Sequence, residues 1–132
     1  MKKFATAIVF GLLSSVPCAW AQSPESILGT WTTQHRMTGH ETFGVSIATF
    51  YPDGTFKLIT RVNIGQMECV GRYEFDGRSL HYVMDDYDPK DVGLDPGPAY
   101  HNPCTEPVEF DEAHNQMYLN GSWWNHQPGE IP

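Results

Sequence analysis

The feature that most constrains the fold is the stretch of residues 50–64, in which a turn separates two segments with strand character. The turn consists of Pro52, Asp53 and Gly54. Proline presets φ for a turn, aspartate can bond its own backbone, and glycine adopts positive φ without steric cost. After the turn, two sets of side chains alternate at every second position as far as residue 64. This period of two is typical of a half-buried strand, so we expect antiparallel strands.

Similar strand and turn signals recur through the rest of the chain. Asp76-Gly77 and Asn120-Gly121 are two-residue turn signals, and each lies between segments of alternating character. Further strands are expected over residues 30–36, 43–48, 67–75, 80–84, 108–110, 117–119 and 123–124. The chain shows no long amphipathic helix and no internal repeat.

A single helical turn is expected before the first strand, over residues 23–27. Ser23 is a good N-cap, and Pro24 suits the first helical position. A break in the alternation predicts a β-bulge near Ala48 or Thr49. Together these signals predict an all-β fold, a small antiparallel up-and-down β-barrel of seven to eight strands with a short N-terminal helical turn.

The N-terminus has the pattern of a secretory signal peptide. A basic start precedes an apolar run over residues 4–13, and Ala19-Trp20-Ala21 supplies the small-x-small cleavage pattern. The apolar run is shorter than the ~20 residues that span a bilayer, so we expect no membrane insertion after cleavage. Residues 1–21 are assigned as the signal peptide and residues 22–132 as a single periplasmic or secreted domain. Lipidation at Cys18 is the alternative, although the residues before it are not the usual small ones.

The charge balance of the mature chain is acidic. Cleavage after Ala21 leaves 6 Lys and Arg against 16 Asp and Glu, a formal net charge of −10. Such a surface repels nucleic acid and anionic lipid, and it attracts basic proteins or cations. Solubility alone is the other explanation of this charge.

Two cysteines, Cys69 and Cys104, remain after cleavage. An even number in an exported chain favours pairing, so we expect one disulfide between them. The bond would close a loop of about 35 residues, which the chain-entropy account values at roughly 4 kcal/mol. It would tie the end of a long proline-rich loop back to the expected strand over residues 67–75.

The opening of the first strand resembles a known family. A helical turn followed by Gly29-Thr30-Trp31 is similar to the Gly-x-Trp start of lipocalin-like (calycin) barrels. Residues 50–56 and 71–77 resemble the repeated hairpins of small bacterial lipocalin-like domains. The resemblance implies a single lipocalin-like β-barrel domain over residues 22–132, in which Trp31 closes the floor of the barrel.

No catalytic signature is evident. No serine lies in a Gly-x-Ser-x-Gly context, and no glycine-rich phosphate loop precedes a helix, so we expect a non-enzyme without a cofactor. The acidic run from Asp85 to Asp95 could bind calcium, but it lacks the EF-hand pattern and a solvated loop is favoured. The six histidines are scattered without a helical i, i+4 pair, so no metal site is expected.

The aromatic residues suggest one function. A small apolar or aromatic ligand could bind in the barrel mouth, beneath a lid formed by the proline-rich loop over residues 87–102. Packing in the core is the alternative role for these side chains. The candidate ligand-binding residues are Trp31, Phe56, Tyr73, Tyr82, Tyr100 and His101.

The charge suggests a second function, a protein-binding module that acts on a basic protein partner. Secreted lysozyme inhibitors of bacteria are similar in size, acidity and barrel form. One class has a Ser-Gly-x-x-Tyr-like strand motif. Val70-Gly71-Arg72-Tyr73 resembles this motif only loosely, because it lacks the serine. A large apolar cavity would favour the small ligand, and a filled barrel with a protruding acidic loop would favour the protein partner. The oligomeric state is left open.

Overall fold

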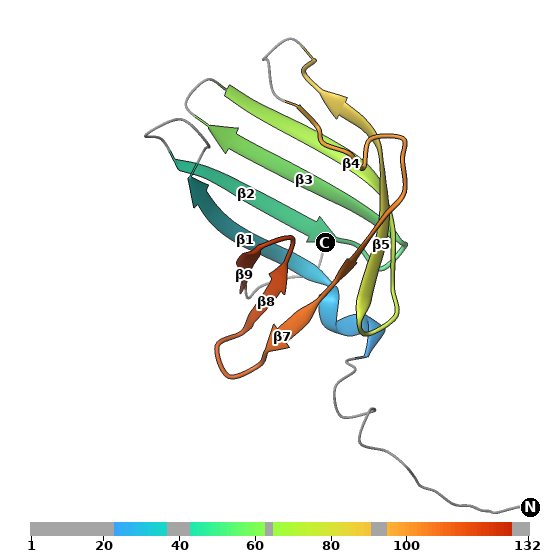
Figure 1. The fold of residues 1–132 in the computed structure, drawn as a ribbon, viewed down its shortest axis with the longest axis vertical. Helices are drawn as coiled ribbons and strands as arrows, with labels where there is room; N and C mark the ends of the chain where they lie inside the picture. The colour runs from blue at the N-terminus through green and yellow to red at the C-terminus, as the bar shows by residue number, and fades with distance from the viewer. Residues whose placement is uncertain (1–22, 37–42, 63–64, 91–94, 128–132) are drawn as a thin grey trace, which may run out of the picture.

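The structure is a computed structural model that describes residues 23–36, 43–62, 65–90 and 95–127 (Figure 1). The predicted signal peptide and Cys18 lie outside the described residues. One 3-10 turn, η2 (Pro24–Ile27), precedes the strands, as predicted. The strands are β1 (Gly29–Arg36), β2 (Phe43–Phe50), β3 (Thr55–Val62), β4 (Gly65–Phe75), β5 (Ser79–Asp88), β6 (Cys104–Pro107), β7 (Glu109–Asp111), β8 (Gln116–Leu119) and β9 (Ser122–Gln127).

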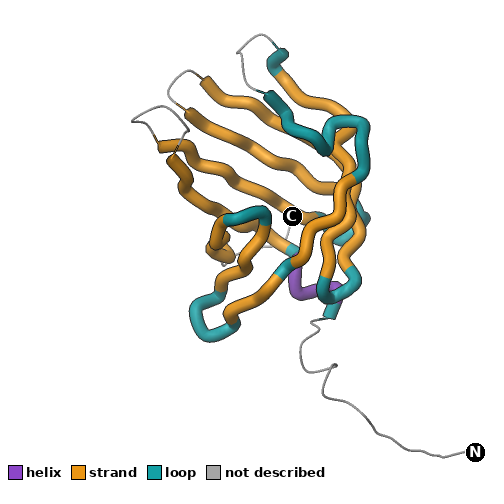
Figure 2. Tube along the Cα trace, viewed as in Figure 1, coloured by secondary structure: helices purple, strands orange, loops and turns teal. Residues whose placement is uncertain are grey.

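The strands form one antiparallel sheet that curls into a nearly closed barrel. Their order is β6-β5-β4-β3-β2-β1-β9-β8-β7. The two edge strands, β6 and β7, are consecutive parts of one extended segment, in which β6 pairs with β5 and β7 pairs with β8. This segment therefore joins the two edges of the sheet, as the tube in Figure 2 shows. The predicted all-β barrel is confirmed. The ninth strand arises because the segment is divided at Val108, which donates its N–H to Arg78 O at 2.8 Å.

The expected turns shape the hairpins. Gly54 has a φ of +91° and the Oδ1 of Asp53 accepts hydrogen bonds from Thr55, which fixes the β2–β3 turn. Asn120 and Gly121 have φ values of +53° and +80°, and they connect β8 to β9 as a two-residue turn. Positive φ at both central positions matches the right-handed twist of the flanking strands.

Trp31 is a core residue at the η2 end of the barrel. It is 3% exposed, and its Nε1–H donates to Ile27 O at 2.9 Å. The ring of His126 lies against it, with centroids 4.5 Å apart. Gly29 makes this arrangement possible, because a Cβ there would lie 2.8 Å from His126 Nε2 and its φ is +105°. The expectation that Trp31 is buried at one end of the barrel is confirmed.

Strand β2 corrects one detail of the sequence interpretation. Its register with β1 is continuous from Gly29↔Phe50 to Arg36↔Phe43, so no bulge lies near Ala48 or Thr49. The small residues of β2 face the interior, because the large side chains of Trp31 and Leu58 stand opposite Ala48 on the neighbouring strands. The irregularity in the sheet lies instead between Val70 and Gly71, where β4 pairs with β5.

The predicted Cys69–Cys104 disulfide is wrong for this structure, in which both residues are free cysteines. Strand β5 lies between the strands that carry them. Cys69 stands opposite Tyr87, and Cys104 stands opposite Tyr82. The offset between these tyrosines along β5 corresponds to roughly 15 Å of strand. A disulfide needs Cα atoms within about 7 Å, so this register keeps the thiols apart.

Candidate functional site

The six predicted ligand-binding residues fall into two groups: Trp31, Phe56, Tyr73 and Tyr82 belong to or pack against one core cluster, whereas Tyr100, with His101 beside it, packs against another. Trp31 lies at the η2 end, whereas Tyr100 bridges to Met84 of β5 and its ring centroid lies 4.0 Å from that of His101. Between them, the Phe56 ring lies 6.1 Å from that of Tyr82. Tyr73 packs against Phe50, with centroids 5.0 Å apart. The structure therefore brings together Phe56, Tyr73 and Tyr82 in one aromatic group and does not gather all six residues at one mouth.

An apolar pocket opens toward the interior of the barrel. Its volume is about 90 Å³. It is lined by Ala48, Phe50, Phe56, Leu58, Leu80, Tyr82, Leu119, Asn120 and Trp124. Burial raises the pKa of Tyr82 to about 12, with smaller contributions from Glu106 and Cys104. Pockets that hold drug-sized ligands have about 300–1,000 Å³, so the aromatic side chains largely fill this interior.

Two larger recesses lie on the outside of the barrel, with volumes of about 720 and 580 Å³. The larger one lies between η2, the β2–β3 turn and the β4–β5 hairpin. Its lining is Pro24, Glu25, Leu28, Pro52, Gly54, Tyr73, Glu74, Phe75, Asp76 and His81. The smaller one continues along β4 and β5 to Pro103, and it shares Gly54, Tyr73, Glu74 and His81 with the first. We call the two together the acidic groove.

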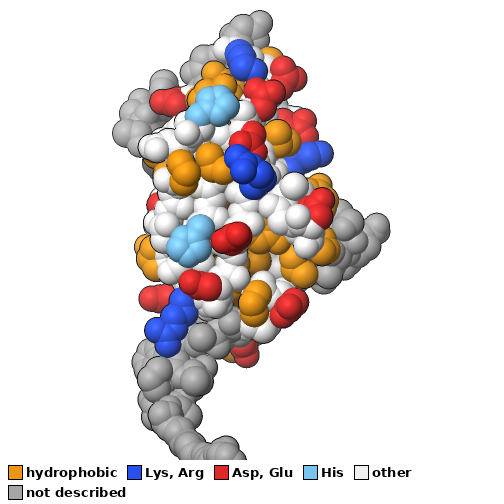
Figure 3. Space-filling view, turned by 90° about the vertical axis from the view of Figure 1, so that its right-hand side faces the viewer, with side chains coloured by type: hydrophobic (Ala, Val, Ile, Leu, Met, Phe, Trp, Pro, Cys, Tyr) orange, Lys and Arg blue, Asp and Glu red, His pale blue; other side chains and the backbone are white. Residues whose placement is uncertain are grey.

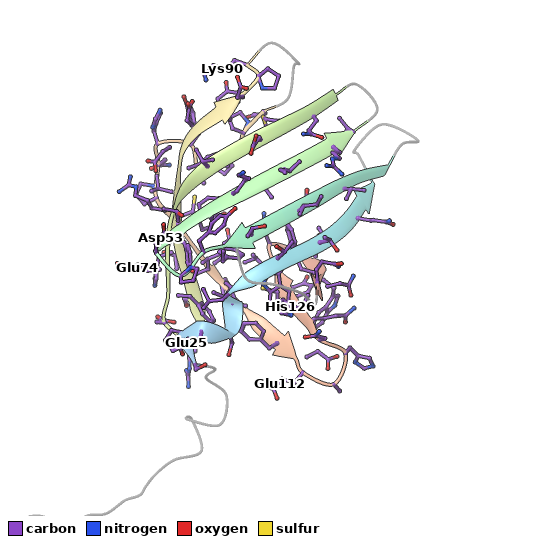
Figure 4. The ribbon with its side chains drawn as sticks, turned by 180° about the vertical axis from the view of Figure 1, so that it is seen from behind. Glu25, Asp53, Glu74, Lys90, Glu112 and His126 are labelled. Carbon is purple, nitrogen blue, oxygen red and sulfur yellow. The ribbon has the colours of Figure 1, made fainter. Side chains whose placement is uncertain are left out.

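The acidic groove has carboxylates on its rim and apolar side chains in its floor. Figure 4 shows Glu25, Glu74 and Asp53 along one side of the molecule, at the end where η2 lies. The space-filling view in Figure 3 faces this same side of the molecule and shows acidic side chains recurring along it, with basic side chains between them. The Oη–H of Tyr73, in the floor, donates to Tyr51 O at 2.7 Å. Burial, with a smaller effect of Asp53, raises the pKa of Tyr73, so this ring stays neutral.

The carboxylates of the groove differ in what they already bind. Asp53 and Asp76 accept hydrogen bonds within their own turns, from Thr55 and from the backbone N–H groups of Arg78 and Ser79. These bonds lower the pKa of both aspartates. Within the described ranges, the side chains of Glu25 and Glu74 have no hydrogen bond or ion pair, and both are exposed. These two glutamates are therefore free to pair with an incoming cation.

The acidic loop singled out from the sequence is different, because its first charges are paired. Asp85 accepts two hydrogen bonds from Arg72, at 2.9 and 2.8 Å, and Asp86 lies 2.9 Å from Lys90 Nζ. The hydrogen bonds from Arg72 and Lys90 lower the pKa of these two aspartates. The loop thus offers less uncompensated negative charge than its sequence suggests.

Sequence reasoning missed Glu25 and Glu74 as site residues. The sequence signal available was that Glu25 lies in a short helical turn and Glu74 near the end of a strand. Nothing in the neighbouring residues indicated that η2 and β4 would lie beside the same recess. In the part of the chain that the structure describes, no three His, Cys, Asp or Glu residues lie together as a metal site. No helix among those residues is long and apolar enough to cross a membrane.

Comparison with known proteins concerns the fold alone. No protein-family model matches the sequence, and no curated protein matches it. The crystal structure of lipoprotein YedD from Klebsiella pneumoniae subsp. pneumoniae MGH 78578 is similar, with a TM-score of 0.50. The alignment covers 86% of this chain and 81% of that chain at 14% identity. This likeness supports the barrel fold and transfers no site residue to this chain.

Proposed function

We propose that this protein is a non-catalytic binding barrel that holds a basic segment of a partner protein in the acidic groove. The observation that carries the proposal is that Glu25 and Glu74, on the rim of a recess of about 720 Å³, have no side-chain partner among the residues that the structure describes. Lysine and arginine fit such a surface, because their apolar stems can cover the floor while the charged heads meet the rim.

Charge complementarity gives this proposal its physical basis. The mature chain has a net charge of −10 if it is cleaved after Ala21. A negative field speeds the encounter with a basic partner, and complementary charges at the rim fix its orientation. The floor residues Leu28, Tyr73 and Phe75 add apolar area and an aromatic face for a cation.

A small apolar ligand is the other hypothesis from the sequence. Phe56 and Tyr82 line the interior pocket, which favours such a ligand chemically. The volume of about 90 Å³ does not favour it, because only a very small molecule would fit without rearrangement of the core. We therefore place recognition on the outer surface of the barrel.

The proposal also places the protein outside the cytoplasm, in the periplasm or secreted. The sequence pattern of residues 1–21 supports export. The similar barrel from Klebsiella pneumoniae is a lipoprotein, which is consistent with export of this chain.

The test is a binding titration with lysozyme, as a folded basic protein, and with an oligo-arginine peptide. Each rim charge contributes about 0.2–1 kcal/mol, so Glu25→Gln with Glu74→Gln should weaken binding about tenfold at low salt. The affinity of the unaltered protein should fall as salt is raised.

The matched control is Asp86→Asn with Asp88→Asn, which removes the same charge at the far end of β5. It should weaken binding less than the groove variant does. Equal effects of the two double variants would show that only net charge matters, and they would overturn the assignment of the groove. Absence of binding to both probes would overturn the proposed class of partner.

A further inference from the structure

An exposed pair of aromatic residues lies on the outer face of the β8–β9 hairpin, away from the acidic groove. Tyr118 is 39% exposed and Trp123 is 45% exposed. They stand directly opposite each other, with ring centroids 5.1 Å apart and planes at 61°. Large aromatic rings exposed side by side are uncommon on a soluble domain and commonly mark a binding surface.

Amide side chains extend this surface along the same face. Gln116 stands opposite Asn125, and its Nε2 donates to Asn125 Oδ1 at 2.8 Å. Asn125 also stands opposite Thr32 of β1, and Gln127 Nε2 donates to Thr32 Oγ1 at 2.9 Å. Residues opposite one another or two positions apart share a face of the sheet, so Gln116 and Asn125 lie about 7 Å from the aromatic pair and Gln127 lies about 13 Å from it.

Each amide has hydrogen-bonding capacity left over. An amide group carries two donors and one oxygen acceptor. The bond between Gln116 and Asn125 leaves the Oε1 of the first and the Nδ2 of the second without a partner in the described chain. Gln127 likewise keeps its Oε1. The surface therefore combines two exposed aromatic rings with amide groups that can still donate and accept hydrogen bonds.

The charges around this surface narrow the chemistry of the ligand. Gln116, Tyr118, Trp123, Asn125 and Gln127 are all uncharged. At the β7 border, Glu109 stands opposite Tyr118, and Asp111 stands opposite Gln116 and lies 2.7 Å from His114 Nδ1. An anionic ligand would be repelled by this border and by the acidic chain as a whole. A basic partner would be drawn to the acidic groove instead, which leaves a neutral ligand.

We propose that this surface is a binding site for a neutral pyranose oligosaccharide. A pyranose has C–H faces that pack on an aromatic ring, and hydroxyl groups that both donate and accept hydrogen bonds. Trp123 and Tyr118 supply the rings, Asn125 supplies a donor, and Gln116 supplies an acceptor. The border carboxylate of Glu109 is a further acceptor for a hydroxyl group. This site is independent of the acidic groove.

The experiment is calorimetric titration of the protein with two probes, an N-acetylglucosamine hexamer and a glucose hexamer. Saturable binding of at least one of them is expected, with an affinity that barely depends on salt because no charge is neutralised. Trp123→Ala should weaken that binding about tenfold or more, whereas Trp123→Phe should retain most of it. Gln116→Leu should also weaken it while leaving the aromatic pair in place.

Two controls separate this site from the groove and from general stickiness. Val70→Ala removes a side chain of similar exposure on β4, and Glu25→Gln with Glu74→Gln alters the groove; both variants should bind sugar as the unaltered protein does. No saturable binding at millimolar concentrations of either probe overturns the proposal. Undiminished binding by the Tyr118→Ala, Trp123→Ala double variant also overturns it. The proposal is also overturned if neither sugar binds and the unaltered protein self-associates in a way that this double variant abolishes.

Discussion

The two ends of the barrel have different cores, one rich in aromatic side chains and the other built from methionine and small residues. The η2 end holds a dense cluster around Trp31, Phe50, Phe75 and Trp124. Both buried tryptophans there donate to backbone carbonyls, Trp31 to Ile27 O and Trp124 to Leu119 O at 3.1 Å. Figure 1 shows β7, β8 and β9 beside η2 at this end, while β2, β3 and β4 extend well beyond them.

The other end, beneath residues 97–101, has a smaller core of Met67, Cys69, Met84 and Ala99. The loop is fastened to β5 by two hydrogen bonds, from Met84 N to Ala99 O and from His101 N to Met84 O, each 2.8 Å long. Methionine is flexible and fills irregular space, so this core specifies its packing less sharply than the aromatic one. The η2 end, with its larger aromatic core, is therefore also the end at which the larger recess of the acidic groove lies.

The largest expected effect is on the stability of the core at the η2 end. Trp31→Ala should cost about 3–5 kcal/mol in the free energy of unfolding, because it leaves a cavity and removes a satisfied N–H group. Tyr100→Ala, at the half-buried loop end, should cost less than about 2 kcal/mol. Equilibrium urea unfolding of both variants measures the difference. Similar losses for the two would remove the distinction between the ends.

A smaller effect is expected where the two regions meet, at Gly71. A Cβ at this position would overlap Val83 O, the Phe56 ring and Met84 Cα, and two of these are backbone atoms that cannot easily move. Gly71→Ala should therefore cost about 1–3 kcal/mol through overpacking. Its neighbour Val70 is exposed, so Val70→Ala should change stability by only about 0.5 kcal/mol. Thermal unfolding of the Gly71→Ala and Val70→Ala variants measures the difference. An unchanged melting temperature for Gly71→Ala would show that the backbone at the register shift between β4 and β5 can move to make room for the methyl group.

The smallest expected effect concerns the loop end, where no disulfide fastens the chain. The melting temperature should be the same with and without a thiol reductant. Two thiols should titrate in denaturant, and Cys69 should react only after unfolding because burial and Glu68 raise its pKa to about 11. A cross-linked Cys69–Cys104 peptide in an unreduced digest would contradict the register across β5.

Features of the fold that depend on neighbours in the chain could be predicted from the sequence. The alternation after Gly54 specified strand β3, and Asn120 with Gly121 specified the turn of the last hairpin. The Gly29-Thr30-Trp31 segment indicated the buried tryptophan. These predictions succeeded because the side-chain period of a strand and the φ requirement of a turn are local properties.

Features that depend on distances across the sheet were decided only by the tertiary structure. The strand order placed β5 between Cys69 and Cys104 and so prevented the expected disulfide. Closure of the barrel brought Glu25 and Glu74, which lie far apart in sequence, to one groove, and it left Tyr100 and Trp31 in different core clusters. The physical reason is that turn chemistry and alternation are set by adjacent residues, whereas register and closure are set by how the whole interior packs.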